Sequence, residues 1–136
     1  MKKKKTKKKT YLCPYCGRQA VLRDARYVYG FKAVVRYVYV CAGYPECNAY
    51  VNVHEWNMEP MGTLANGELR NKRIQTHKVF DRIWQNGIMT KGNAYEWMKI
   101  KLDLSRDQAH IANFNESMCD RFIAECTKTL QIKNVI

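Results

Sequence analysis

The sequence predicts an α+β protein in which a small four-cysteine β ribbon precedes a helical bundle. Two pairs of cysteines lie within the first 47 residues and are separated by a segment rich in valine and tyrosine. Beyond about residue 63, apolar residues recur at the three- and four-residue spacing of helices. We therefore expect a lysine-rich tail over residues 1–10, a ribbon over 11–55 and a helical domain over 56–136.

The tail, MKKKKTKKKT, carries seven of the 24 basic residues of the chain. Residues 11–136 then hold 17 basic and 12 acidic residues, so the net charge of +12 falls to +5 without the tail. A block of like charges repels itself and buries no apolar surface, so we expect it to be disordered. It can attract nucleic-acid phosphates without reading sequence. A solubilising or localisation segment has the same composition, and both interpretations stay open.

Two further features concern the cellular compartment. No apolar run reaches the ~18 residues of a membrane span, and the N-terminus lacks the apolar core of a secretory signal. We expect a cytoplasmic protein. In that reducing compartment the six cysteines are metal ligands or buried thiols rather than disulfides.

The two cysteine pairs have the spacing of metal-binding turns. They lie in CPYCG and CAGYPEC, with 24 residues between the pairs, and the four residues are Cys13, Cys16, Cys41 and Cys47. Two intervening residues let both sulfurs of the first pair reach one ion, and Gly17 lets the backbone turn there. Four thiolates suit one tetrahedral Zn²⁺ with no open position, so we predict a single structural zinc. The alternatives are unrelated buried thiols, or His54 replacing one cysteine.

The segment between the pairs is typical of strands. Residues 20–40 are dense in β-branched and aromatic side chains, with Gly30 as a possible turn, and residues 50–53 form a further short strand. From Val34 onward, alternate residues sort to two faces of the predicted sheet. Antiparallel strands that join two cysteine turns make a zinc ribbon.

CPYCG, the strands and CAGYPEC together resemble the C-terminal four-cysteine zinc ribbons of bacterial type I DNA topoisomerases. The resemblance covers about residues 11–53, and its most specific part is Tyr44-Pro45-x-Cys47. It implies a ribbon that binds single-stranded DNA through aromatic and basic side chains. It does not imply strand passage, because the rest of the chain is too short for a topoisomerase catalytic region.

The whole chain also resembles a family of small phage and bacterial zinc-finger proteins of unknown function, in which such a ribbon precedes a helical segment. The resemblance rests on PMGTLANGELRNKR, on His77 with FDRIW, on AYEW and AHIA, and on Cys119. It implies the same order of ribbon and helices, and it implies that the cytoplasm is that of a bacterium, or of the bacterial host of a phage. It brings no established activity.

Aromatic and basic residues are interleaved in the predicted ribbon, where eight of the nine tyrosines lie between residues 11 and 50. Rings stack on unpaired bases with about 1–3 kcal/mol each, while cations follow the backbone. A small ribbon has little aliphatic core, so some tyrosines instead pack over the sheet. The candidate nucleic-acid-binding residues are Arg18, Tyr27, Tyr29, Phe31, Lys32, Arg36, Tyr37, Tyr39 and Tyr44. Single-stranded DNA is the favoured partner, with RNA as an alternative.

Four helices with short connections are expected after the ribbon. They run over about 63–85, 90–102, 105–112 and 115–130, and the third follows the capping box SRDQ. Arg70, Arg73 and His77 lie on one face of the first helix, which we interpret as solvated rather than phosphate-binding. The turn before the third helix offers a helix-turn-helix alternative, but no base-reading helix is evident. Cys119 and Cys126 are seven residues apart, about 10.5 Å along a helix, so they are predicted as buried thiols.

No recurring catalytic motif is present, and the acidic residues are too scattered for a two-metal nuclease site. The only candidates are a His77–Asp81 pair and Cys119 as a nucleophile, and we expect no enzymatic activity and no small-molecule or membrane ligand. Two functions remain. The first is a nucleic-acid-binding accessory protein. The second is a protein-interaction module of phage or bacterial origin with purely structural zinc, whose helical surface engages a host or phage protein.

Overall fold

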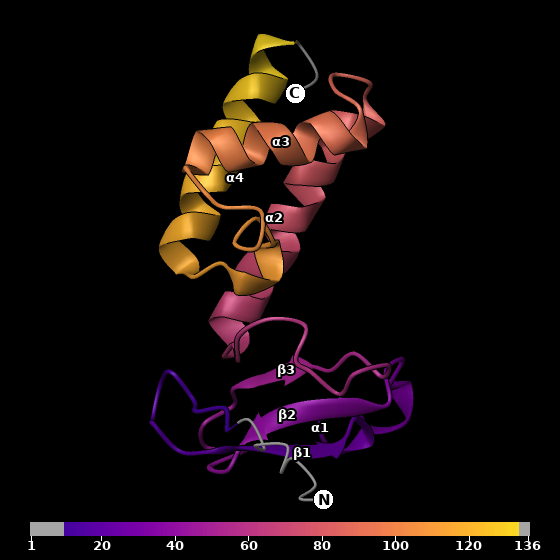
Figure 1. Ribbon diagram of the computed structural model, residues 1–136, viewed down its shortest axis with the longest axis vertical. Helices are drawn as coiled ribbons and strands as arrows, with labels where there is room; N and C mark the ends of the chain where they lie inside the picture. Colours follow the sequence, from indigo (N-terminus) through magenta and orange to yellow (C-terminus); the bar gives the residue numbers. More distant parts are fainter. Residues whose placement is uncertain (1–9, 134–136) are drawn as a thin grey trace, which may run out of the picture. The chain divides into compact units, whose positions relative to one another are not determined.

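The computed structural model describes residues 10–133, which form a cysteine-containing three-stranded unit and a helical unit (Figure 1). The chain divides between these two compact units at Asn66 and Gly67. The strands lie in the first unit and the longer helices in the second, which confirms the α+β class. The tail predicted to be disordered lies, apart from Thr10, outside the described residues. Within residues 10–133, no helix combines the length and the apolar character that a membrane crossing requires.

The ribbon sheet has the order β1-β2-β3 and is antiparallel throughout. Its strands are β1 (Ala20–Asp24), β2 (Tyr37–Cys41) and β3 (Tyr50–Asn52). In β1, Ala20 lies opposite Cys41 and Asp24 lies opposite Tyr37. The start of β1, which follows the first cysteine turn, therefore lies beside Cys41 at the end of β2. Tyr37 marks the opposite end of the sheet.

Side chains of β2 alternate between two small cores, as expected for a pleated strand. Val38 and Val40 are buried with Ala25 on one face, against partly buried tyrosine and valine side chains. Cys41 packs on the other face with Cys13, where Ala49 and Leu64 are also buried. Each face of the sheet is thus covered by a different part of the chain.

The connection from β1 to β2 differs from the expected strand and turn. It contains a short helix, α1 (Arg26–Tyr29), and a 3₁₀ turn, η1 (Gly30–Lys32). The amides of Val28 and Tyr29 donate to the carbonyl of Ala25, whose side chain is fully buried. A helical turn here places Val28 and Tyr29 over the Val38–Val40 face of the sheet. Residues 26–32 are therefore helical because this covers the Val38–Val40 face, although their local propensity favours a strand.

Residues 56–66 belong to the ribbon unit and not to the helical domain, so the predicted boundary at residue 55 moves to Asn66. Backbone pairing explains the correction. Val53 forms a bridge with Pro60, and Tyr50 exchanges two backbone hydrogen bonds of 3.1 Å with Ala65. This segment also buries Leu64 against the cysteine side of the sheet.

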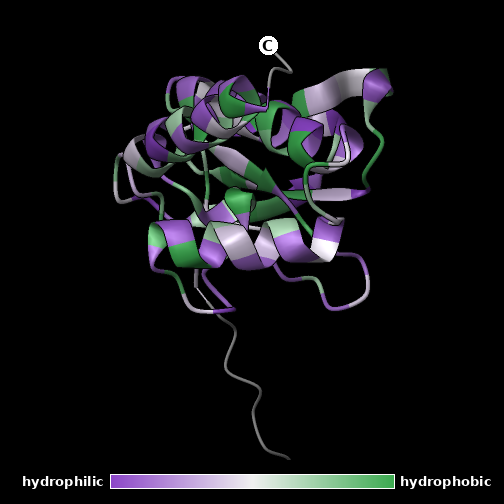
Figure 2. Cartoon of the chain, turned by 90° about the horizontal axis from the view of Figure 1, so that it is seen from above, coloured by the Kyte–Doolittle hydropathy of each residue, from purple (hydrophilic) through white to green (hydrophobic). Residues whose placement is uncertain are grey.

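The helical unit contains α2 (Gly67–Gln85), α3 (Lys91–Leu102) and α4 (Glu116–Ile132), together with a 3₁₀ turn, η2 (Ile111–Asn113). Apolar and polar residues alternate along these helices (Figure 2). Side-chain caps start α3 and α4: Thr90 accepts from the amide of Asn93, and Asn115 accepts from the amide of Met118. The largest fully buried side chains of this unit are Phe80, Phe114, Phe122, Ile83, Met98 and Leu130.

The predicted helix over 105–112 is not formed. Both capping-box hydrogen bonds between Ser105 and Gln108 are present, at 2.9 and 3.3 Å, but they close only one turn. The chain is then extended at His110, with φ −131° and ψ 123°. Ala109 and Ile111 are both buried, and residues two apart share a face in an extended chain but not in a helix. Burial of this pair outweighs the capping signal.

The interpretation of Arg70, Arg73 and His77 as a solvated face of α2 is wrong for Arg73. Its side chain is 8% exposed, and its Nε donates to the carbonyl of Phe114 at 2.9 Å. Arg73 lies one helical turn from the buried residues Leu69 and Thr76. It therefore joins the loop before α4 to α2 and is not placed to bind phosphate.

Replacing Arg73 with methionine should lower the unfolding free energy of the helical unit by about 1–3 kcal/mol. Methionine preserves most of the apolar stem but leaves the carbonyl of Phe114 without this buried donor. The measurement is urea denaturation followed by far-UV circular dichroism. Lys78→Met is the matched control, because Lys78 is exposed on the same helix. Equal midpoints for the two variants would show that the Arg73 hydrogen bond contributes nothing.

Candidate metal centre

Four cysteine sulfurs converge at one end of the ribbon sheet. Cys13 and Cys16 come from the turn before β1, Cys41 ends β2, and Cys47 lies in the loop that leads to β3. The sulfurs of Cys13 and Cys47 are 3.5 Å apart, those of Cys16 and Cys41 are 3.2 Å apart, and all four lie within 4.8 Å of one another. In the described part of the chain, these cysteines form the only group of three or more potential metal ligands brought this close.

The first cysteine turn is held by backbone hydrogen bonds within a small hairpin. Leu12 pairs with Gln19, the amide of Cys13 donates to the carbonyl of Arg18 at 2.8 Å, and the amide of Gly17 donates to that of Cys13 at 2.9 Å. Gly17 has φ +76°, a left-handed conformation that side-chain-bearing residues rarely adopt. The CPYCG sequence therefore positions two sulfurs through local geometry alone.

The second cysteine turn consists of the five residues 42–46 and is closed by hydrogen bonds at both ends. The amide of Tyr44 donates to the carbonyl of Cys41 and the amide of Cys47 donates to that of Gly43, each at 3.0 Å. The amide of Gly43 also points at the Cys41 sulfur, 3.4 Å away. A Cβ at Gly43 would lie 2.6 Å from Nη1 of Arg18, so this glycine lets the Arg18 side chain lie against the turn.

The four thiols have unequal acidities. A hydrogen bond from the Arg18 backbone lowers the pKa of Cys16 to about 6. Burial raises the pKa of Cys41 to about 12 and also raises the pKa of Cys47. Burial thus opposes charge on two of the sulfurs, and a divalent cation offsets this by stabilising their thiolates.

The spacing of the sulfurs fits zinc. Tetrahedral Zn²⁺ with Zn–S bonds of about 2.3 Å places its sulfurs about 3.8 Å apart, close to the two separations given above. Four sulfurs complete the tetrahedron and leave no position for water or substrate. The chemistry of such a site is structural: the metal fixes the two turns and the strand ends that carry them.

Comparison with known families agrees with this donor set. The profile of a family described as a zinc-finger-containing domain matches residues 9–129. The chain belongs to this family. The match covers the ribbon and most of the helical unit, so both are parts of the zinc-finger-containing domain. Neither the curated proteins nor the solved structures contain a match to the chain.

In this zinc-finger-containing domain, the four cysteines fit a single structural zinc site. The alternative in which His54 replaces a cysteine does not hold, because β3 carries the chain away from the sulfurs. The amide of Val53 donates to the carbonyl of Tyr37, at the opposite end of β2, and the His54 ring lies 6.1 Å from the ring of Trp56. Cys119 and Cys126 are buried in α4, which confirms the prediction of buried thiols there.

The predicted nucleic-acid-binding residues do not share one surface. Arg18, Tyr27, Phe31, Lys32 and Arg36 are exposed, whereas Tyr29, Tyr37, Tyr39 and Tyr44 are half-buried. The Tyr29 hydroxyl donates to Asn52 at 2.8 Å. The Tyr39 ring packs 4.8 Å from that of Tyr11, and burial raises the pKa of Tyr39. Tyr29 and Tyr39 are therefore packing residues. Tyr29, at the end of α1, packs against the Val38–Val40 core, whereas Tyr39, on β2, packs against the core that contains Cys13 and Cys41.

A contiguous set of aromatic and basic side chains lies beside the second cysteine turn. The guanidinium of Arg23 lies 4.5 Å over the ring of Tyr27, and that ring lies 5.6 Å from the ring of Tyr44. Arg18 reaches the same turn at Gly43. We call Arg18, Arg23, Tyr27 and Tyr44 the tyrosine face. Arg23 was absent from the sequence-derived candidates, because the expected strand would place residues 23 and 27 about 13 Å apart.

Proposed function

We propose that this protein is a zinc-stabilised, single-stranded nucleic-acid-binding protein that uses the tyrosine face. The observation that carries the proposal is the Arg23–Tyr27–Tyr44 contact, in which the Tyr27 side chain is 48% exposed. Half-exposed rings with guanidinium groups beside them are the components that stack unpaired bases and follow a phosphate backbone. DNA is the favoured strand, since the resemblance to topoisomerase ribbons implies it.

Zinc acts in this proposal only by holding the binding face in place. Tyr44 lies between the ligands Cys41 and Cys47, so the metal fixes the turn that carries it. The Tyr27 ring packs against Tyr44 of that turn, and the guanidinium of Arg23 lies over Tyr27. The lysine-rich segment adds attraction that depends on charge and not on base identity.

The environment of Cys119, the candidate nucleophile, supports a binding role without catalysis. Cys119 is fully buried, and burial raises its pKa, whereas a nucleophilic cysteine needs an accessible thiolate. Asp81, one helical turn from His77, instead accepts a hydrogen bond from the indole Nε1 of Trp84 at 3.2 Å. We infer a protein that binds its partner and leaves it unchanged.

The same cysteine chemistry bears on the compartment. Thiolates that hold zinc must stay reduced, and reducing conditions prevail inside cells. We therefore place the protein in the cytoplasm of a bacterium or of a phage-infected bacterial host.

Replacing Tyr27 with alanine should weaken binding of a fluorescent single-stranded oligonucleotide by about fivefold or more, because one stacking ring is lost. The measurement is fluorescence anisotropy with zinc-loaded protein across a salt series, in the full chain and in a chain lacking residues 2–9. Leu22→Ala is the matched control: Leu22 is exposed on β1 and, one residue from Arg23, points to the opposite face of the sheet.

Two results would separate the tyrosine face from the lysines. Binding that survives removal of residues 2–9, with a shallow salt slope and a loss on Tyr27→Ala, supports the proposal. Binding that disappears with residues 2–9 and ignores Tyr27→Ala would contradict it. The lysines would then be the whole attraction, and the folded units would be better studied as a protein-interaction module.

A further inference from the structure

A tryptophan is exposed at the tip of a loop at the end of the sheet opposite the cysteines. Trp56 is 82% exposed, although large apolar rings are usually covered. The loop is held by backbone hydrogen bonds of 2.8 Å from His54 to Glu59 and from Met58 to His54. Val53 and Pro60 pair across its base. The ring is thus presented outward by an ordered turn.

A pocket of about 310 Å³ lies beside this ring. Its walls include the apolar residues Val34, Val35, Trp56 and Met61, and its polar groups are His54 and Glu55. Val34 is 96% exposed, so one wall is itself an uncovered apolar side chain. The volume is near the lower limit of small-ligand pockets, and the mixture of apolar walls with a few polar groups is typical of them.

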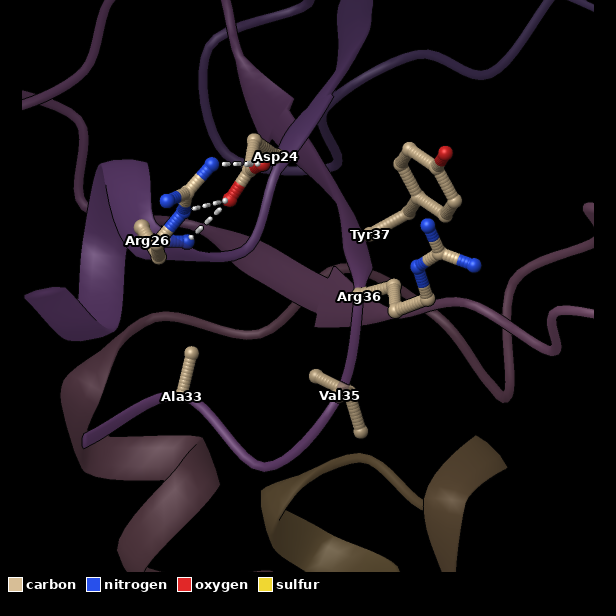
Figure 3. A pocket seen from close by; sticks show the side chains of 6 residues that line it. All are labelled: Asp24, Arg26, Ala33, Val35, Arg36 and Tyr37. Atoms are coloured by element: carbon tan, nitrogen blue, oxygen red, sulfur yellow. Dashed lines mark hydrogen bonds and ion pairs between the residues drawn. The ribbon is translucent and has the colours of Figure 1, made fainter. Parts of the chain in front are cut away.

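A second pocket, of about 250 Å³, shares Val35 with the first and contributes two arginines (Figure 3). Arg26 is held there by Asp24 through hydrogen bonds of 3.0 and 2.9 Å. Arg36, beside Tyr37, is not held in this way. Its Nε lies 3.5 Å from Glu55, and the two side chains are 74% and 57% exposed. An ion pair this exposed contributes little, so Arg36 can exchange Glu55 for another anion.

We propose that Trp56 and Arg36 form a second site for single-stranded nucleic acid, in which an unpaired base stacks on Trp56 at the pocket and Arg36 takes the adjoining phosphate. The inference rests on the proposed function and extends it from the tyrosine face to the opposite end of the sheet. The exposed ring of Trp56 follows directly after Glu55, which pairs with the exchangeable cation, and this combination of ring and cation suits a nucleotide. His54 and Glu55 offer hydrogen-bonding groups to the edge of a base. An apolar peptide would use the ring but would not need Arg36.

The first test compares Trp56→Ala with Trp56→Phe in the full, zinc-loaded chain. The probe is a single-stranded oligothymidylate at a salt concentration where residues 2–9 no longer alter affinity. Trp56→Ala should weaken binding by about fivefold or more, whereas phenylalanine retains a stacking ring and most of the affinity. Quenching of intrinsic fluorescence by the probe should fall in Trp56→Phe, because the indole that stacks is gone.

Glu55→Gln gives a second readout that a purely structural role would not produce. Glutamine keeps the size of the side chain but removes the negative charge next to Arg36, so binding of the oligothymidylate should tighten by about two- to fivefold. Arg36→Gln in the same background should abolish the gain. Zinc content and melting temperature of each variant confirm that the ribbon is folded.

The outcomes distinguish this site from the tyrosine face. Weakening by Trp56→Ala together with tightening by Glu55→Gln supports the second site. Unchanged affinity in Trp56→Ala, while Tyr27→Ala still weakens binding, overturns the second site and leaves the proposed function intact. Unchanged affinity in both Trp56→Ala and Tyr27→Ala overturns the second site and the proposed function together. Quenching of Trp56 by an apolar peptide, with none by the oligothymidylate, would instead assign the pocket to a protein partner and overturn the inference.

Discussion

Replacing Cys41 with serine should release the zinc and unfold the ribbon, while the helical unit stays folded. Cys41 is buried at the end of β2, its sulfur lies 3.2 Å from that of Cys16, and its side chain is part of the buried cluster that contains Cys13. A neutral hydroxyl is a poor substitute for a thiolate ligand. Structural zinc contributes on the order of 10 kcal/mol, which exceeds the stability that a unit of about 60 residues gains from its core.

The measurement is zinc content per chain after gel filtration, with near-UV circular dichroism for the tyrosines and far-UV for the helices. Cys119→Ala is the matched control, because that thiol is equally buried but lies in α4, outside the sulfur group. It should retain one zinc per chain. A full complement of tightly bound zinc in Cys41→Ser would overturn the four-cysteine assignment, and loss of zinc in Cys119→Ala would show that the units do not fold separately.

The metal centre was predictable because its information is local. Each cysteine turn is defined by a few consecutive residues, Gly17 among them, and the two turns need only one antiparallel sheet to meet. The start of α4 at Asn115 was predictable for the same reason, since a cap acts within one turn. Both features depend on hydrogen bonds between residues that lie close together in the sequence.

Features set by distant partners were the ones that sequence reasoning missed. Arg73 reads as a surface cation until the carbonyl of Phe114, 41 residues away, is placed beside it. Segment 56–66 reads as a loop until Tyr50 pairs with Ala65. Trp56 lies in a polar stretch, and only the structure shows that its ring is outside the core. The same long-range packing leaves two candidate binding tyrosines, Tyr29 and Tyr39, partly buried against the two cores.

Truncating Phe122 to alanine should produce the opposite outcome to the loss of Cys41. The Phe122 side chain is fully buried in α4, and its ring lies 5.3 Å from Phe80 of α2, 5.6 Å from Trp97 of α3 and 6.1 Å from Phe114. One side chain therefore joins all three helices and the loop before α4. Removing a buried phenylalanine costs about 3–5 kcal/mol through lost burial and the cavity left behind. That is a large part of the stability of a small unit.

Far-UV circular dichroism during a thermal scan should show the helices of Phe122→Ala melting at a much lower temperature, with one zinc per chain retained. Ile100→Ala is the control, since Ile100 is exposed on α3 and its truncation should change stability by no more than about 0.5 kcal/mol. Zinc retention decides the question that both substitutions address. If Phe122→Ala keeps its zinc and Cys41→Ser keeps its helices, each unit folds on its own core, one metal-based and one aromatic. If either variant loses both its zinc and its helices, the two cores depend on each other.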